Sequence, residues 1–494
     1  MDDVKMDNTS ERIEDVKGEN QTIVGELVMP HSLAALSEAE YTRIGKKATL
    51  KMDMTIMPIL VVMYILNYLD RQNIASAKLA NIEKDLSLDT VEYQTAVSIL
   101  FVGYILMQVP SNLIVGKITW PGVYICAGMA AWGVISALVA VVNSFGGLLA
   151  ARICLGMVEA IFFPGALYFL SLFYNRKQFA FRTAILYSGS QLGNAFGGLF
   201  AIGILRLDGA HGLAGWRWLF LIEGVLTTFL AIVFAFILPN SNKKILGLSK
   251  LECEYVQWNF AKDQGQVDDI HEISAWSGLK MAIVDPKTWL LMGILYSTYI
   301  VGAVVQFFAS VVQGLGYDRT TTLALTAPPF ILCVFCMLIN GYHSDLKQER
   351  FLHIVIPLAI TLVANIIAVS SLNTAARYVA MMLLPGSFYS AAVVILSWIT
   401  ASLSQPSVKR AAAIALINSF CNTPNIWCSY LYYSAPRYVT AFIVNVAATG
   451  AAIAFAVASL IYLKRQNRKL ERGENTGKNG PTPDQIAAGF RYTL

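Results

Sequence analysis

About a dozen apolar stretches, each long enough to cross a lipid bilayer, dominate this chain. A spanning helix needs roughly 20 predominantly apolar residues. Such stretches cover residues 53–74, 93–115, 121–141, 146–174, 183–205, 216–238, 288–313, 321–341, 351–371, 377–401, 409–432 and 438–463. Lipid offers no water to an open backbone, so each span must be a helix. Charged residues make up 14% of the chain, against roughly 25% in soluble proteins. The sequence therefore predicts an all-α membrane protein with twelve transmembrane helices.

The predicted spans fall into two sets of six, separated by a polar stretch over residues 240–285. Two matched halves joined by a long loop are typical of transporters built from repeats, whose substrate site lies between the halves near the bilayer midplane. A membrane enzyme or a channel would not need this symmetry. We divide the chain into an N-terminal tail (1–51), an N-terminal six-helix half (52–239), a central loop (240–286), a C-terminal six-helix half (287–463) and a C-terminal tail (464–494).

Basic residues near the ends of the spans predict the orientation. Those in the short loops are evenly divided between the two sides, so the tails decide. Both tails are basic beside the membrane, at Arg43, Lys46, Lys47 and Lys51, and at Lys464, Arg465, Arg468, Lys469 and Arg472. We expect a multi-pass plasma-membrane protein with both termini in the cytosol and no cleaved signal peptide. The net charge of +5 then belongs to a membrane surface and not to a nucleic-acid partner.

Four ionisable residues lie inside apolar spans. There each costs roughly 2.5–3.5 kcal/mol on insertion scales and marks a partner, a water cavity or a function. Asp70 and Arg71 lie in the first span and share a helix face with Asn67. Arg152 and Glu159, seven residues apart in the fourth span, share another face. Because these spans run in opposite directions, both arginines fall in the outer half of the membrane. Glu159 lies about 10 Å deeper than Arg152, at about 1.5 Å per residue.

These residue types suit a carrier that couples an organic anion to protons. Two arginines that face one cavity can clamp a carboxylate with paired donors. A poorly solvated carboxyl holds a proton more readily than one in water. We therefore expect Arg71 and Arg152 to bind substrate, and Asp70 and Glu159 to carry the coupling proton. The alternative is a pair of salt bridges between helices with no role in transport.

Neutral polar side chains on other spans are candidate hydrogen-bond partners of the substrate. They are Asn67 in the first span, Gln191 in the fifth, Tyr299 in the seventh, and Asn418 and Asn422 in the eleventh. The two asparagines form a polar stripe with Asn425, on a helix that Pro424 could loosen. Hydrogen bonds between helices would use the same groups equally well, and both alternatives stay open.

Three further features are assigned to structure. Glu223, near the outer end of the sixth span, is expected to pair with a nearby arginine. Small residues four apart let helices approach closely, as at Gly189, Gly193 and Gly197 in the fifth span. Cys333 and Cys336 lie mid-helix with no second pair nearby, which indicates apolar packing. We expect no metal and no cofactor, only the proton as coupling ion.

Several short segments together carry a family resemblance. They are residues 67–74, 152–164 and 216–224, Lys409-Arg410-Ala411, Pro436-Arg437-Tyr438 and Gly489-Phe490-Arg491-Tyr492. In these the chain resembles the anion:cation symporter family of the major facilitator superfamily, in the pattern of fungal allantoate, nicotinate and pantothenate permeases. The resemblance implies the twelve-helix fold, alternating access and proton-driven uptake. It also implies that Asp70, Arg71, Arg152 and Glu159 serve proton coupling and anion binding. The Gly-rich basic loop of the superfamily is degraded at 116–120 and better kept at 341–345.

The expected protein is a monomeric transporter that imports a small organic anion by proton symport. The anion would be a carboxylate of the vitamin or ureide type. Nicotinate, allantoate, pantothenate and a sugar acid all present a carboxylate, so its identity stays open. A drug or metabolite exporter of the same fold is an alternative. A transporter-like nutrient sensor is a further one, although the short tails argue against it.

Overall fold

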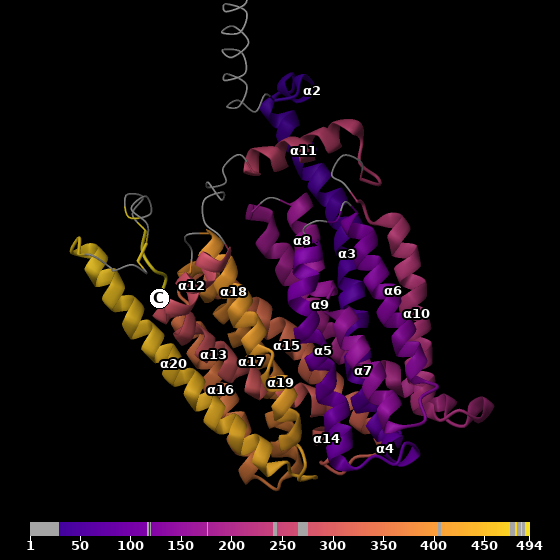
Figure 1. Ribbon diagram of the computed structural model, residues 1–494. Helices are drawn as coiled ribbons and strands as arrows, with labels where there is room; N and C mark the ends of the chain where they lie inside the picture. Colours follow the sequence, from indigo (N-terminus) through magenta and orange to yellow (C-terminus); the bar gives the residue numbers. More distant parts are fainter. Residues whose placement is uncertain are drawn as a thin grey trace, which may run out of the picture.

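The computed structural model describes residues 29–115, 118, 120–174, 176–240, 245–264, 275–403, 407–474, 480–481, 486 and 490–494. Every regular element within these ranges is a helix, and the long helices form one bundle (Figure 1). This confirms the predicted all-α fold. Most of the N-terminal tail, most of the loop at 116–120 and Gly489 of the tail motif lie outside the described residues.

Helices cover the ranges of all twelve predicted spans. We call the first six the N-terminal half: α3 (Glu38–Leu79), α5 (Thr90–Val115), α6 (Pro121–Val139), α7 and α8 (Phe145–Glu159 and Phe162–Phe173), α9 (Arg176–Ile204) and α10 (Gly215–Ile237). The C-terminal half begins with α13 (Pro286–Gly302), η4 (Ala303–Phe307) and α14 (Phe308–Gln313), which together form its first span. It continues with α15 (Arg319–Lys347), α16 (Phe351–Ser370) and α17 (Thr374–Ser402). Its last elements are α18 (Ser407–Cys421), α19 (Pro424–Trp427), η5 (Cys428–Leu431) and α20 (Val439–Glu471). The short elements are α2 (His31–Ala34), α4 (Ile82–Asp85), η1 (Leu205–Leu207), η2 (Ala210–Gly212), α11 (Lys250–Gln264) and α12 (Ala275–Val284).

Ten helical segments of the described chain are long and apolar enough to cross a membrane. The other two predicted spans correspond to α9 and α18. α9 buries the polar side chains Gln191 and Asn194. α18 ends at Cys421, ahead of Pro424, which opens the short α19. Proline has no N–H to donate, which explains why one continuous helix does not run through this segment.

The first helix is longer than the first predicted span, 53–74. α3 begins at Glu38, where the Ser37 hydroxyl accepts from the Glu40 N–H and the Glu40 carboxylate accepts from the Ser37 N–H. This reciprocal pair is a capping box. Residues 38–51, assigned to a tail, are therefore helical. A prediction based on hydropathy does not find this part of the helix, because it contains many charged residues.

The hydrophobic clusters of the described residues show how the halves meet. We call the end where α3 begins and α20 ends the terminal end, and the opposite end the far end (Figure 1). One cluster at the far end includes Ile74 and Tyr93 of the N-terminal half together with Phe307, Leu323 and Phe442 of the C-terminal half. Toward the terminal end, the buried residues fall into two clusters, one in each half. Within the described part, buried residues of both halves thus join in one cluster at the far end, and the partly buried Ile426 of α19 also packs against the N-terminal cluster.

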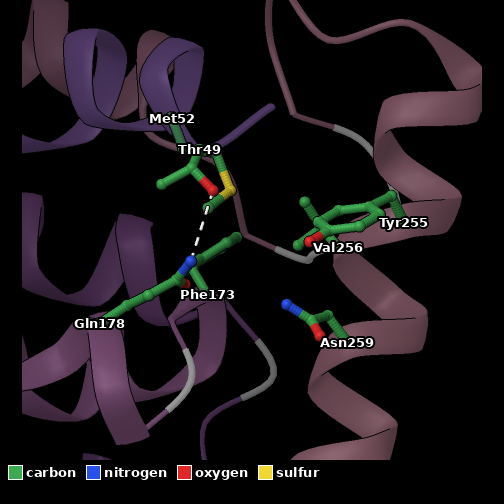
Figure 2. Close-up of a pocket in the computed structure, with 7 residues that line it drawn as sticks. All are labelled: Thr49, Met52, Phe173, Gln178, Tyr255, Val256 and Asn259. Atoms are coloured by element: carbon green, nitrogen blue, oxygen red, sulfur yellow. Dashed lines mark hydrogen bonds between the residues drawn. The ribbon is translucent and has the colours of Figure 1, made fainter. Parts of the chain in front are cut away.

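The central-loop helix α11 docks on the terminal end of α3. Lys51 Nζ donates to Glu252 Oε2 at 2.8 Å, and the Tyr41 and Tyr255 rings lie 5.0 Å apart. A small pocket separates the two helices (Figure 2). At its edge Gln178 Nε2 of α9 donates to Thr49 Oγ1 of α3 at 3.4 Å. These contacts join α11 to the N-terminal half.

Residues 490–494 return to the terminal end of the C-terminal half. Tyr492 is buried, and its hydroxyl accepts from Lys287 Nζ of α13 at 2.9 Å. Trp398 Nε1 of α17 donates to the Thr493 carbonyl at 2.9 Å. The Tyr492 N–H donates to Asn467 Oδ1 of α20, also at 2.9 Å. This segment therefore ties three helices together.

Candidate substrate and proton site

Arg71 on α3 and Glu159 on α7 form an ion pair inside the N-terminal half. Arg71 Nε donates to Glu159 Oε2 at 2.6 Å, and the Glu159 side chain is fully buried. The guanidinium also lies over the ring of Tyr104, 4.8 Å from its centroid, and 5.3 Å from that of Tyr68. Aromatic faces attract a cation in such positions. The carboxylate and two rings thus hold Arg71 in place.

Asp70 points away from its neighbour Arg71, because successive residues of a helix are about 100° apart. It is fully buried, and Ser136 Oγ of α6 donates to Asp70 Oδ1 at 2.6 Å. Asp70 Oδ2 has no hydrogen-bond partner among the described residues. Glu159 and Arg152 are close enough to act on Asp70 electrostatically. The structure therefore brings all four predicted charges into one cluster.

Arg152 turns toward α5. It is 1% exposed, and its Nε donates to the backbone carbonyl of Ala96 at 3.2 Å. Its Nη1 has no partner in the described part of the chain. Buried donors are costly to leave unpaired. Arg152 therefore keeps a free donor beside Asp70 and Glu159, both of which act on it electrostatically.

A glycine brings α7 close enough to α5 for this contact. A Cβ at Gly156 would lie 2.0 Å from the Leu100 carbonyl oxygen, so only glycine fits. On α5, Gly103 meets the Ile153 carbonyl in the same way, with its Cβ position 2.3 Å away. The close approach aligns Arg152 with the Ala96 carbonyl.

The predicted neutral donors divide into two groups. Asn67 is buried next to Glu159 and belongs to the cluster. Gln191 is buried on α9, where its Nε2 donates to Ser190 Oγ at 3.1 Å. Tyr299 of α13 lies near Tyr187 of α9. Gln191 and Tyr299 therefore lie where α9 faces the C-terminal half.

The prediction that the asparagines of the eleventh span form a stripe on one helix face is wrong. Asn422 and Asn425 lie beyond the end of α18 at Cys421. Asn422 Nδ2 donates to the Asn418 carbonyl at 2.8 Å, and Asn425 Nδ2 to the Asn422 carbonyl at 3.4 Å. The break before Pro424 turns these two amides onto the backbone of their own segment.

Comparisons with known proteins agree with this architecture. Residues 60–429 match the family model described as Major Facilitator Superfamily. The chain belongs to this superfamily. It is 30% identical to the uncharacterized transporter C1002.16c of Schizosaccharomyces pombe over 85% of this chain and 84% of that protein. It is also 30% identical to the MFS-type transporter cnsO of Penicillium expansum, over 91% and 90% of the two chains.

A solved structure shares the fold of this major facilitator protein. It is a bacterial homologue of the human lysosomal transporter Spinster, crystallised in an inward-facing, unoccupied conformation. The TM-score is 0.63 at 14% identity, covering 86% of this chain and 96% of that one. Together with the family match, this makes the chain a multi-pass secondary transporter of the major facilitator fold, and not an enzyme.

One partner in this facilitator differs from the prediction. Among the described residues no arginine pairs with Glu223; instead, Asn73 Nδ2 of α3 donates to Glu223 Oε2 at 2.7 Å. The neighbouring Arg217 donates instead to the Ala140 carbonyl at 2.5 Å and to Asn143 Oδ1 at 2.8 Å. Arg217 lies close to the start of α10 and reaches the loop after α6, whereas Glu223 faces the interior.

Sequence reasoning also missed residues that complete the site. Ser136 and Tyr104 give no sequence signal, since isolated hydroxyls in apolar spans are common. Gln72 is next to Arg71, and its Nε2 donates to Asn194 Oδ1 of α9 at 3.0 Å and to the Val305 carbonyl of η4 at 3.5 Å. Gln72 therefore links the charged cluster to the C-terminal half.

Proposed function

We propose that this transporter imports a small organic anion, a carboxylate of the vitamin or ureide type, together with protons. The observation that carries the proposal is the buried cluster of Asp70, Arg71, Arg152 and Glu159. Charges inside a membrane are retained for a function by default. The cluster offers two guanidinium groups for an anion and two carboxyls for protons. The family resemblance to anion:cation symporters supports the same roles.

The ion pair supports a mechanism for coupling. In the structure the Glu159 carboxylate accepts a hydrogen bond from the Arg71 guanidinium. A proton on Glu159 would remove its charge and free Arg71 for the substrate carboxylate. The anion and the proton would then favour each other's binding, as linkage requires. Arg152 would supply the second set of donors through its free Nη1.

Neutral residues complete the proposed substrate site. Asn67 lies at the charged cluster, and Gln191 and Tyr299 lie where α9 faces the C-terminal half. Asn418 and Asn422 stay candidates from the other side of the bundle. The protein would work as a monomer in the plasma membrane, with both termini in the cytosol and the central loop 240–286 between two moving halves.

The test is uptake of a panel of labelled carboxylates into cells that express the protein. For the transported anion, uptake should rise as external pH falls and collapse when a protonophore removes the gradient. Cells that carry the vector alone provide the background. Uptake that requires sodium and ignores pH would contradict proton coupling, and export of the panel would contradict import.

A further inference from the structure

A third buried acid of the N-terminal half, Glu223, has no cationic partner among the residues that the structure describes. It is 1% exposed on α10, and its described hydrogen bond comes from the Asn73 amide at 2.7 Å. Its second oxygen, Oε1, has no partner among the described residues. Thr227, one turn further along α10, is also fully buried with an unpartnered hydroxyl in that part of the chain. The surroundings of the Glu223 carboxyl are therefore buried and short of hydrogen-bond donors.

The charged groups around Glu223 make its ionised form unfavourable. From α3 the group that acts on it electrostatically is Asp70, another acid. α6 carries no Asp, Glu, Lys, Arg or His. Arg217 on α10 directs its guanidinium to Ala140 and Asn143. On α9, Arg182 pairs with Asp53 at 2.6 Å at the terminal end. Burial of a carboxylate that has no cation beside it costs on the order of several kcal/mol, even after the protein relaxes around it.

We propose that Glu223 and Asp70 form a second proton-binding site, in addition to Glu159. Each has an oxygen without a partner in the described structure, Glu223 Oε1 and Asp70 Oδ2. Arg152 acts electrostatically on Asp70, whereas the charged group that acts on Glu223 in the described structure is the acid Asp70. A buried carboxyl that has another acid nearby and no cation keeps its proton. In the resting state Glu223 holds this proton. When it leaves Glu223 Oε1, Asp70 Oδ2 takes it up, and the new Glu223 carboxylate keeps the Asn73 hydrogen bond.

The geometry places this site between the far end and the ion pair. Asn73 is three residues after Asp70 on α3, which puts it about 4.5 Å nearer the far end. Glu223 follows Gly215, the first residue of α10, by eight residues, so it lies about 12 Å from the start of that helix. A proton that enters from the far end would reach Glu223 and Asp70 before Glu159. The coupling role of Glu223 and Asp70 rests on the proposed proton symport. The protonation of Glu223 does not depend on that proposal.

Infrared difference spectroscopy on the purified, full-length protein in lipid tests the protonation. Protonated carboxyls have a carbonyl stretching band that carboxylates lack. We expect one such band near neutral pH that disappears in Glu223→Gln and persists in Glu159→Gln. The exposed Glu38→Gln is the control. Glutamine keeps the size of the side chain and an oxygen for the Asn73 amide, so the fold is preserved. A spectrum unchanged by Glu223→Gln between about pH 5 and 8 would overturn the proposal.

Liposome transport tests the coupling role. Each coupled proton multiplies the limiting accumulation of substrate by about ten per unit of pH gradient, because one pH unit corresponds to about 1.4 kcal/mol per proton. Glu223→Gln should therefore retain exchange of labelled substrate and lose about tenfold in accumulation per pH unit. Loss of the infrared band with wild-type accumulation would overturn the coupling role. Absence of gradient-driven accumulation in the wild type would refute symport itself, while the infrared result would still decide the protonation of Glu223.

Discussion

The guanidinium of Arg71 donates to the Glu159 carboxylate over 2.6 Å and so ties α3 to the last residue of α7. A buried pair of this kind is weak evidence for stability, because desolvation offsets much of the attraction. It is better suited to a switch, since removing the charge of one partner leaves the other available. A substrate carboxylate could then take the place that Glu159 vacates.

Loss of the Arg71 charge should weaken substrate binding. In Arg71→Gln we expect binding of the transported carboxylate to purified protein to fall about 10- to 100-fold. A hydrogen bond to a charged group contributes about 1.5–3 kcal/mol, and each 1.4 kcal/mol or so is a factor of ten. Arg71→Lys keeps the charge but loses the planar fork, so it should rescue binding only in part. Arg217→Gln, whose guanidinium faces the loop at Asn143, is the matched control. Wild-type affinity in Arg71→Gln would exclude the anion clamp.

Neutralising Glu159 should separate exchange from accumulation. Glu159→Gln resembles the protonated acid and leaves Arg71 free, so the variant should bind substrate and exchange it across a liposome membrane. Its limiting accumulation should fall about tenfold per unit of pH gradient, because the proton carried by Glu159 no longer has to enter with the substrate. The measurement is uptake with and without the gradient. An unchanged response to the gradient would remove Glu159 from the coupling mechanism.

The sequence predicted the helices and the residues of the charged cluster well, because span length and helix spacing are local properties. Asp70, Arg71, Arg152 and Glu159 do meet in one place. The choice of partners was not predictable. Arg152 donates to the Ala96 carbonyl because α5 and α7 approach closely at Gly156, and such an approach depends on packing between distant segments.

The wrong predictions about Glu223 and the start of α3 also have their cause in contacts between distant segments. Glu223 was expected to pair with an arginine, but the residue that faces it across the helix contact is Asn73. The start of α3 was missed since its charged turns are stabilised by the Ser37 cap and by contacts with α11. The break in the eleventh span did have a sequence signal, namely Pro424.

The docking of α11 should depend on the ionised form of Glu252. Burial raises the pKa of this carboxyl, but hydrogen bonds from Lys51 and from the Ser249 N–H outweigh that effect and hold the pKa below its usual value. A lowered pKa in the docked state means that the stabilisation is present above the pKa of the free acid, about 4.3. It is lost as pH falls through the docked value.

Amide hydrogen exchange of α11, corrected for its intrinsic pH dependence, should therefore be constant through the neutral range and accelerate in strong acid. Glu252→Gln should show fast exchange already at neutral pH. The control is Glu254→Gln, since Glu254 accepts instead from the Ser32 hydroxyl. Equal protection in wild type and Glu252→Gln at neutral pH would show that the ion pair does not hold the helix.

The contact of residues 490–494 should stabilise the C-terminal half. Tyr492 is buried against Lys287 and Asn467. Tyr492→Ala removes a buried aromatic ring and should destabilise this half by about 3 kcal/mol. Tyr492→Phe removes only the hydroxyl and should cost about 1 kcal/mol. Thermal unfolding midpoints of the two variants in one detergent give the comparison. Equal midpoints for Tyr492→Ala and the wild type would mean that this segment is not held in place.

Gly198 should control closure at the far end. α9 packs against α15 there, and a Cβ at Gly198 would lie 2.4 Å from both the Leu323 carbonyl oxygen and Thr326 Oγ1. Gly198→Ala therefore pushes the two halves apart where they share a core. Overpacking of this kind costs about 1–3 kcal/mol, which shifts the balance away from the closed far end about 5- to 100-fold.

A thiol at the far end reports this shift. Ser310 of α14 is 3% exposed, so Ser310→Cys should react slowly with a water-soluble maleimide while the far end is closed. Combined with Gly198→Ala, its labelling rate should rise about 5- to 100-fold. Gly203 lies on the same helix, with open space around its Cβ position. The control Gly203→Ala should therefore leave the labelling rate unchanged. Equal rates in the two alanine variants would show that the Gly198 contact does not hold the far end closed.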